Sequence, residues 1–152
     1  MTTVDTGSTA FVVMSDTCLD DQCNTNYRFH STQSSTFQQM GHASHQGYLD
    51  NSSYDGMWAK DTVEIANYTL SEFGFVLVNR TANEGDSRSL IGFGWPSDDE
   101  HEPPSWPYQW SKDWDNPSFG MYLGRLQGTE DGVEFSDDYA SGLLTLGYVG
   151  AE

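Results

Sequence analysis

The apolar residues of this chain fall in short runs with the period of β-strands, and this pattern constrains the fold more than any other feature. Residues 10–14 and 74–78 are compact apolar runs, and residues 120–123 and 143–149 continue the pattern toward the C-terminus. Clusters of Gly, Asn, Asp and Ser separate the runs, as the turns between strands require. The sequence therefore predicts an all-β fold.

Helical patterns are few and short. The best candidates lie near residues 34–36 and within residues 106–114, where three tryptophans recur every fourth residue and would share one helical face. We assign these tryptophans to packing, with stacking on a sugar or peptide as the alternative. The acidic, proline-bearing stretch around them, residues 97–118, is interpreted as a surface excursion. We expect residues 1–152 to form a single domain, because this length can bury one core and is too short for two.

The charge balance excludes two classes of partner. The chain carries 23 acidic and 6 basic residues, for a formal net charge of -17. Such a chain repels nucleic acid phosphates and anionic membrane surfaces. It also contains no apolar stretch long enough to cross a bilayer. The acidity fits either simple solubility or work in acid, where many carboxylates are protonated and self-repulsion falls.

Cysteines and glycosylation sequons indicate an oxidising compartment. The spacing of Cys18 and Cys23 fits a small surface disulfide loop, whereas a zinc site would need further ligands nearby. Three asparagines, Asn51, Asn67 and Asn79, each begin a glycosylation sequon. Together these features predict the secretory pathway. No signal peptide precedes the first motif, so we expect the natural N-terminus to lie further upstream.

The segment with the clearest chemistry is Val-Asp-Thr-Gly-Ser-Thr at residues 4–9, which leads into the apolar run 10–14. A carboxylate that activates water needs a fixed position and hydrogen-bond donors around it. Gly7 permits a close backbone approach to Asp5, and the neighbouring Thr and Ser supply hydroxyls. Asp-Thr-Gly also occurs in ordinary turns with no catalytic role. The order of the motifs that follow decides between an ordinary turn and a catalytic one.

That order resembles the N-terminal lobe of pepsin-like aspartic proteases. The match begins at the Asp-Thr-Gly-Ser turn and includes the close cysteine pair. Four further segments follow in the family's order: residues 28–37, 56–63, 89–96 and 119–123. The resemblance implies an all-β lobe of the bilobal acid protease fold. It also implies that the chain is incomplete at both ends and that the second lobe is absent.

The resemblance assigns a role to each residue of the turn. Asp5 matches the first catalytic aspartate, Thr6 and Gly7 match the turn that orients it, and Ser8 matches the residue hydrogen-bonded behind it. The support beneath the turn is assigned to a short segment: Leu90, Ile91 and Gly92. In this family two aspartates, one from each lobe, share a proton and hold a water that attacks the peptide bond. No cofactor and no metal is implied.

The chain contains no second Asp-Thr-Gly or Asp-Ser-Gly after Gly7. We therefore expect the partner aspartate to come from a C-terminal lobe of the same protein, and this chain alone to be inactive. The implied substrate is a peptide or an unfolded protein. The implied location is extracellular or lysosomal, and the sequence leaves that choice open.

Two departures from the family pattern motivate alternatives. The flap tyrosine is assigned to Tyr48, or to Tyr54 if the register differs. The stretch 48–56 is one residue longer than the family's usual spacing and lacks the usual Gly-x-Gly. Val12 stands where the family commonly has a tryptophan that hydrogen-bonds the flap tyrosine. A protein that binds peptides without cleaving them is one alternative. A single-lobe homodimer that supplies Asp5 twice is another.

Other constellations are set aside. His42 and His45 have a spacing that would bind a metal on a helix, but their surroundings are not helical, so we predict no metal site. The acidic run at residues 98–102 lacks the loop pattern of a calcium site and is interpreted as a solvated face.

Overall fold

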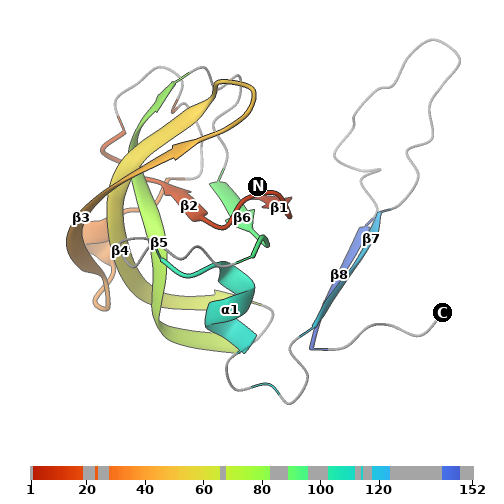
Figure 1. Cartoon of the computed structure of the whole chain (residues 1–152). Coiled ribbons are helices and arrows are strands. Elements are labelled where there is room, and N and C mark those ends of the chain that lie inside the picture. Colours follow the sequence, from red (N-terminus) through yellow and green to blue (C-terminus); the bar gives the residue numbers. More distant parts are fainter. Residues whose placement is uncertain are drawn as a thin grey trace, which may run out of the picture. The chain divides into compact units, whose positions relative to one another are not determined.

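The computed structural model describes residues 2–18, 23, 28–65, 68–82, 89–95, 103–111, 114, 118–123 and 142–147. The chain divides into two compact units, Met1–Trp110 and Ser111–Glu152. Strands dominate the described part, as Figure 1 shows, and this confirms the predicted all-β class. The expectation that residues 1–152 form one lobe stays a prediction.

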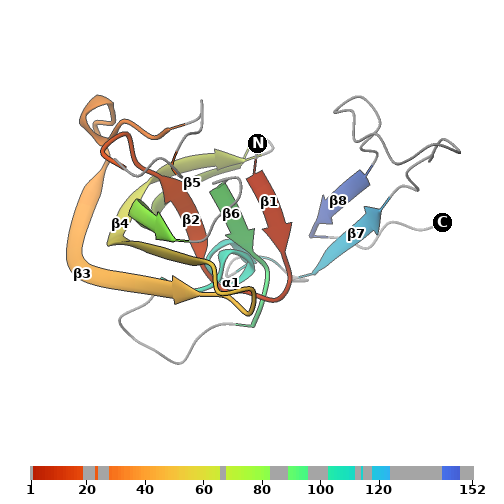
Figure 2. The same ribbon diagram turned by 90° about the horizontal axis from the view of Figure 1, so that it is seen from above.

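A six-stranded sheet forms the first unit, in the order β1-β6-β2-β5-β4-β3. Its strands are β1 (Thr2–Asp5), β2 (Phe11–Met14), β3 (Gln38–Gly47), β4 (Ser53–Ile65), β5 (Tyr68–Ala82) and β6 (Ser89–Gly92). The long strands β3, β4 and β5 pair antiparallel in succession and curve together (Figure 1). The short strands β1, β6 and β2 lie side by side in Figure 2, with β6 in the middle.

The main core lies where β2 meets β5. The two strands run parallel, with Val12 opposite Val76 and Met14 opposite Val78. β-Branched and apolar side chains pack well on a pleated surface, which is why these runs form strands. The buried cluster consists of Val12, Met14, Cys18, Cys23, Tyr54, Val76 and Val78.

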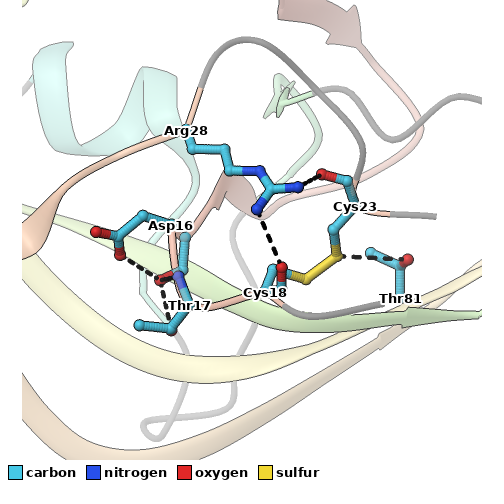
Figure 3. The surroundings of a disulfide bond; sticks show 7 residues. Asp16, Thr17, Cys18, Cys23, Arg28 and Thr81 are labelled. Carbon is cyan, nitrogen blue, oxygen red and sulfur yellow. Dashed lines mark hydrogen bonds between the residues drawn. A yellow bond between two sulfur atoms is a disulfide. The ribbon is translucent and has the colours of Figure 1, made fainter. Parts of the chain in front are cut away.

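The two cysteines form a disulfide, as predicted (Figure 3). They lie in the core cluster, with Cys18 only 1% and Cys23 0% exposed, while the loop expected at the surface, residues 19–22, lies outside the described residues. The guanidinium of Arg28 donates hydrogen bonds to the carbonyls of Cys18 and Cys23, at 3.3 and 2.8 Å. Arg28 thereby satisfies two carbonyls that flank a buried bond.

A buried carboxylate joins the start of β3 to β4. The side chain of Asp61, 4% exposed, accepts hydrogen bonds from the hydroxyls of Ser34 and Thr36 and from the backbone N–H of Thr62. Three donors compensate the cost of burying this carboxylate. The short helix expected near residues 34–36 is a 3-10 turn, η2 (Ser31–Gln33), that begins three residues earlier.

The region expected to be a surface excursion is partly core, and this is a correction. The α-helix of the described part, α1 (Trp106–Ser111), buries Trp106 and Trp110, which are 1% and 4% exposed. The centroids of the two indole rings lie 4.4 Å apart, and the ring of Trp106 also packs against that of Phe93, with centroids 4.7 Å apart. The acidic and proline-rich neighbours concealed this apolar face in the sequence. The packing role predicted for these two tryptophans is confirmed.

Gln109 fastens this helix to β5. Its side-chain oxygen accepts a hydrogen bond from the N–H of Gly74 at 2.7 Å, and its nitrogen donates to the carbonyls of Gly74 and Pro104 at 2.9 and 2.7 Å. The amide thus pairs with the backbone of Gly74 as another strand would. A β-carbon at Gly74 would lie 3.3 Å from the oxygen of Gln109, so glycine fits this close approach.

The second unit contains an antiparallel pair, β7 (Phe119–Leu123) and β8 (Gly142–Leu146). The N–H of Gly147 donates to the carbonyl of Ser118 at 2.8 Å, which extends the pairing past the end of β8. Within the part of the chain that the structure describes, no helix has the length and apolar character needed to span a membrane.

Candidate active site

Asp5 ends β1 and begins a tight turn. The backbone N–H of Gly7 donates to Asp5 Oδ1 at 2.8 Å, which closes the turn through the side chain. A β-carbon at residue 7 would lie 3.3 Å from the same oxygen, so glycine gives the carboxylate room. This local bond is the one that Asp favours in turns, and it fixes the direction in which the carboxylate points.

Strand β6 holds the turn from beneath. In the sheet register Asp5 lies opposite Gly92, and the N–H of Phe93 donates to the carbonyl of Asp5 at 2.6 Å. The N–H of Gly94 donates to the carbonyl of Ser8 at 2.7 Å. The turn is therefore tied to the segment after β6 at both its start and its end.

Close contact between β6 and the chain beyond the turn explains the glycine at residue 92. The N–H of Gly92 donates to the carbonyl of Ala10 at 2.9 Å. A β-carbon at Gly92 would lie 2.4 Å from the carbonyl carbon of Thr9, which no side chain tolerates. Leu90 pairs with Thr3 on one side and Val12 on the other and packs against the core cluster, and Ile91 pairs with Val4 and Phe11.

The hydroxyl of Ser8 lies just behind this turn in the chain. Its oxygen is buried and has no hydrogen-bond partner among the described residues. Thr6, by contrast, is exposed at the turn. Among the described side chains of the turn, it is the carboxylate of Asp5 that is held by a hydrogen bond, from the N–H of Gly7.

A cleft of about 680 Å³ opens above Asp5. One wall is the turn and the other is the tip of the β3–β4 hairpin; Figure 1 shows this tip above the level of β1 and β6. Clefts of this size hold small ligands and short peptide segments. The lining residues are Asp5, Gly7, Ser8, Thr9, Gln46, Gly47, Tyr48, Leu49 and Asp50.

The hairpin tip is a compact loop closed by backbone bonds. The N–H of Tyr48 donates to the carbonyl of Ser52 at 3.0 Å, and the N–H of Asn51 donates to the carbonyl of Tyr48 at 3.1 Å. Asn51 has φ 66°, a left-handed conformation that asparagine tolerates and that three-residue hairpin loops require. The loop therefore forms without the Gly-x-Gly of the family pattern.

A side-chain clamp reinforces the tip. Asp50 Oδ1 accepts hydrogen bonds from the hydroxyl of Ser52 at 2.6 Å and from its backbone N–H at 2.9 Å. These two bonds, the hydroxyl's first, lower the pKa of Asp50 below its ordinary value of 3.8.

The structure separates the two candidate flap tyrosines. Tyr48 lines the cleft with Asp5, whereas Tyr54 is 3% exposed and belongs to the core cluster. Their rings pack edge to face, with centroids 5.6 Å apart. Val12 lies in the same cluster, and Tyr48 packs against it. The tyrosine of the hairpin tip thus rests on an apolar and aromatic base.

Five lining residues were not singled out from the sequence: Thr9, Gln46, Gly47, Leu49 and Asp50. Leu49 is fully exposed at the tip, at 106% of its reference surface. Leu49 and Asp50 could have been identified from their position directly after Tyr48. If Tyr48 is at the tip of a hairpin that lines the cleft, the next residues of the tip line it as well.

The remaining candidates lie apart from the turn or beyond the described residues. Asn51 is exposed at the hairpin tip and Asn79 is exposed on β5, while Asn67 lies outside the described residues. His45 Nδ1 lies 2.6 Å from Asp55 Oδ1, and the ring of His42 lies tilted against that of Trp58, with centroids 5.9 Å apart. Where side chains are described, no group of three or more His, Cys, Asp or Glu is placed to hold a metal ion.

Comparison with known proteins identifies the family to which this chain belongs. The family model of the eukaryotic aspartyl proteases matches residues 1–143. Major aspartyl peptidase 1 of Cryptococcus neoformans var. grubii is 31% identical over 140 residues, which cover 89% of this chain. The chain spans 28% of the length of that relative. With an Asp-Thr-Gly turn supported by β6 beneath a hairpin tip, and a family match over nearly its whole length, the chain belongs to the eukaryotic aspartyl protease family.

Proposed function

We propose that the complete protein is an aspartic endopeptidase and that Asp5 is one of its two catalytic aspartates. The observation that carries this proposal is the position of Asp5 on the wall of the cleft, with one carboxylate oxygen fixed by the N–H of Gly7 at 2.8 Å. Membership of the aspartyl protease family supports proteolysis as the reaction.

The second aspartate comes from a C-terminal lobe of the same protein. Two carboxylates held about 3 Å apart share one proton, because two full negative charges repel strongly at that distance. One of them takes a proton from a water held between them, and that water attacks the carbonyl carbon of the peptide. The protonated partner donates a hydrogen bond to the developing oxyanion. The pair acts as a unit, so neither role belongs permanently to Asp5.

Besides Asp5 itself, this chain contributes two parts of the machinery. The bonds from Phe93 and Gly94 hold the backbone of the turn, so that Asp5 needs little reorganisation during the reaction. The hairpin tip with Tyr48 covers the cleft and keeps bulk water from the reacting atoms. An extended peptide fits between turn and tip, which favours unfolded proteins and peptides as substrates.

We place the protein in the secretory pathway, either extracellular or lysosomal. A disulfide buried in the core forms in an oxidising compartment. Asn51 and Asn79 are exposed, as a glycan requires, and we propose both, with Asn67, as glycosylation sites.

The test is cleavage of an unfolded protein at acid pH by the complete protein and by its Asp5→Asn variant. We expect the substitution to lower the rate by about 100-fold or more, since the amide cannot take part in proton transfer. Asp55→Asn, which removes another exposed carboxylate of the β3–β4 hairpin, should cleave at the wild-type rate.

Other outcomes would favour the alternatives. Peptide binding without cleavage by the wild type would identify an inactive binding protein, an alternative favoured by the fully buried Val12, which has no donor to offer Tyr48. Cleavage by residues 1–152 alone would instead identify a single-lobe homodimer.

A further inference from the structure

The three glycosylation sequons differ in the exposure of the hydroxyl that completes each one. The residues that carry these hydroxyls are Ser53 for Asn51, Thr69 for Asn67 and Thr81 for Asn79. In the structure Thr69 is exposed and Ser53 is half-buried, whereas Thr81 is only 5% exposed. A sequon is recognised through its asparagine and its hydroxyl together. The three sites are therefore not equivalent once the chain has folded.

Asn79 itself lies on the surface, at a bulge of β5. The pairing of β5 passes from Val78 to Arg80 while its partner β4 advances by one residue, so Asn79 is the extra residue of the bulge. A bulged residue is left out of the ladder of paired residues, and the side chain of Asn79 is exposed. A glycan on Asn79 is therefore compatible with the folded sheet.

The hydroxyl of Thr81, two residues further along β5, faces the disulfide (Figure 3). It lies 3.8 Å from Cys23 Sγ, and the hydroxyl is the donor because a cystine sulfur carries no hydrogen. Cys23 is itself buried, and the guanidinium of Arg28 holds its carbonyl at 2.8 Å. In the sheet register Thr81 lies opposite Tyr54, which belongs to the core cluster. In the folded, oxidised protein this hydroxyl is thus out of reach of a modifying enzyme.

We infer that the folded, oxidised protein can carry a glycan on Asn79 but cannot acquire one, so that Asn79 is modified only before the Cys18–Cys23 disulfide and β5 come together. The inference rests on the proposed secretory location and glycosylation, and it adds the condition under which one site is used. Cys23 precedes Thr81 by 58 residues, so both cysteines are available for pairing before the sequon of Asn79 has been synthesised. Disulfide formation and glycan transfer therefore compete.

The transfer is a substitution at the first sugar of a lipid-linked oligosaccharide. A bond forms between Asn79 Nδ2 and the anomeric carbon of that sugar, and the bond from this carbon to the lipid pyrophosphate breaks. The pyrophosphate leaves with the bonding electrons, and the amide nitrogen loses one proton. Because the transfer depends on the hydroxyl of Thr81 as well as on the amide, burial of Thr81 is sufficient to stop it.

An alternative explanation is that every sequon is modified during synthesis, before any part of the chain folds. The burial of Thr81 would then have no effect, and Asn79 would be occupied as fully as Asn67. The two explanations separate in conditions that change the oxidation state of the cysteines and leave the sequons intact.

The first experiment measures the occupancy of each asparagine by peptide mass spectrometry, in the complete protein made by secreting cells with and without dithiothreitol. Occupancy of Asn79 should be lower than that of Asn67 in untreated cells and should rise toward it when dithiothreitol prevents disulfide formation. Asn67 is the matched control, because the hydroxyl of Thr69 is exposed. The double variant Cys18→Ser, Cys23→Ser should reproduce the rise at Asn79 without dithiothreitol.

The second experiment presents the complete protein, folded and oxidised but made without glycans, to purified oligosaccharyltransferase and its lipid-linked donor. Asn67 should be modified and Asn79 should not, whereas the reduced and alkylated chain should be modified at both.

Two results would overturn the inference alone. One is equal modification of Asn79 and Asn67 in the folded protein, and the other is an occupancy of Asn79 in cells that dithiothreitol does not change. Absence of glycans from all three sequons in secreting cells would instead refute the proposed glycosylation, and the inference with it.

Discussion

The ring of Tyr48 packs edge-on against the ring of Tyr54, with their centroids 5.6 Å apart and an angle of 86° between the planes. One tyrosine lines the cleft and the other is buried in the core, so the pair connects the hairpin tip to the core cluster. This contact, together with the packing of Tyr48 against the cluster that contains Val12, positions the tip without a tryptophan at residue 12.

Replacing Tyr54 by leucine should therefore destabilise the protein and loosen the tip. Loss of the aromatic contact and incomplete filling of a site that is 3% exposed should lower the free energy of unfolding by about 2–4 kcal/mol. Urea denaturation measures this loss. Tyr122→Leu, at a side chain that is 64% exposed, should change stability by less than about 1 kcal/mol. Equal losses in the two variants would contradict the role of Tyr54.

Gly92 should not tolerate alanine. The new β-carbon would lie 2.4 Å from the carbonyl carbon of Thr9 and 2.7 Å from the backbone nitrogen of Ala10, and neither backbone atom has room to move. We expect a loss of about 3 kcal/mol or more, measured by denaturation. Gly47→Ala is the control, because its β-carbon would meet only the end of the His45 side chain, at 3.7 Å. A stable Gly92→Ala variant would show that β6 is less tightly packed against the turn.

The strands and the turn were predictable because their signals are local. The apolar runs 10–14 and 74–78 became β2 and the buried middle of β5, since a compact apolar run is visible in consecutive residues. The clamp between Asp50 and Ser52 is local too, and an Asp two residues before a Ser is a recognisable turn signal, but it was not singled out from the sequence. The Asp-Thr-Gly turn was found in the same way.

What was missed depends on contacts between distant residues. Gln109 and Gly74 are 35 positions apart, and no pattern in either neighbourhood indicates the two hydrogen bonds between them. The packing role of Trp106 and Trp110 was predicted from their spacing, but the prolines and acidic residues around them concealed how deeply they are buried against Phe93 and each other. The burial of the cystine has the same origin, since β2 and β5 enclose it.

Removal of the Asp61 carboxylate should eliminate the hydrogen bonds that connect the segment before β3 to β4. In Asp61→Ala the hydroxyls of Ser34 and Thr36 and the N–H of Thr62 lose their acceptor in a buried site. We expect the free energy of unfolding to fall by about 2–4 kcal/mol. Asp55→Ala, in the same strand but exposed, should cost less than about 1 kcal/mol. Equal effects would show that the three donors find other partners.

The clamp at the hairpin tip should depend on pH in a defined direction. Hydrogen bonds from the hydroxyl and then the N–H of Ser52 lower the pKa of Asp50 from 3.8. Because the folded-state pKa lies below the unfolded value, the clamp stabilises the tip at pH values above 3.8. That contribution is lost as the pH falls through the lowered pKa, where the carboxylate is protonated and stops accepting both bonds.

Ser52→Ala tests this assignment directly. Without the hydroxyl, the larger of the two causes, the pKa of Asp50 should move back up toward 3.8, as followed by the NMR chemical shift of its side-chain carboxyl carbon. Ser52→Thr keeps a hydroxyl and should retain the lowered pKa. Both variants preserve the sequon at Asn51, so glycosylation does not differ between them. If the titration midpoint of Asp50 were the same in wild type and Ser52→Ala, the hydroxyl of Ser52 would not be the cause of the lowered pKa.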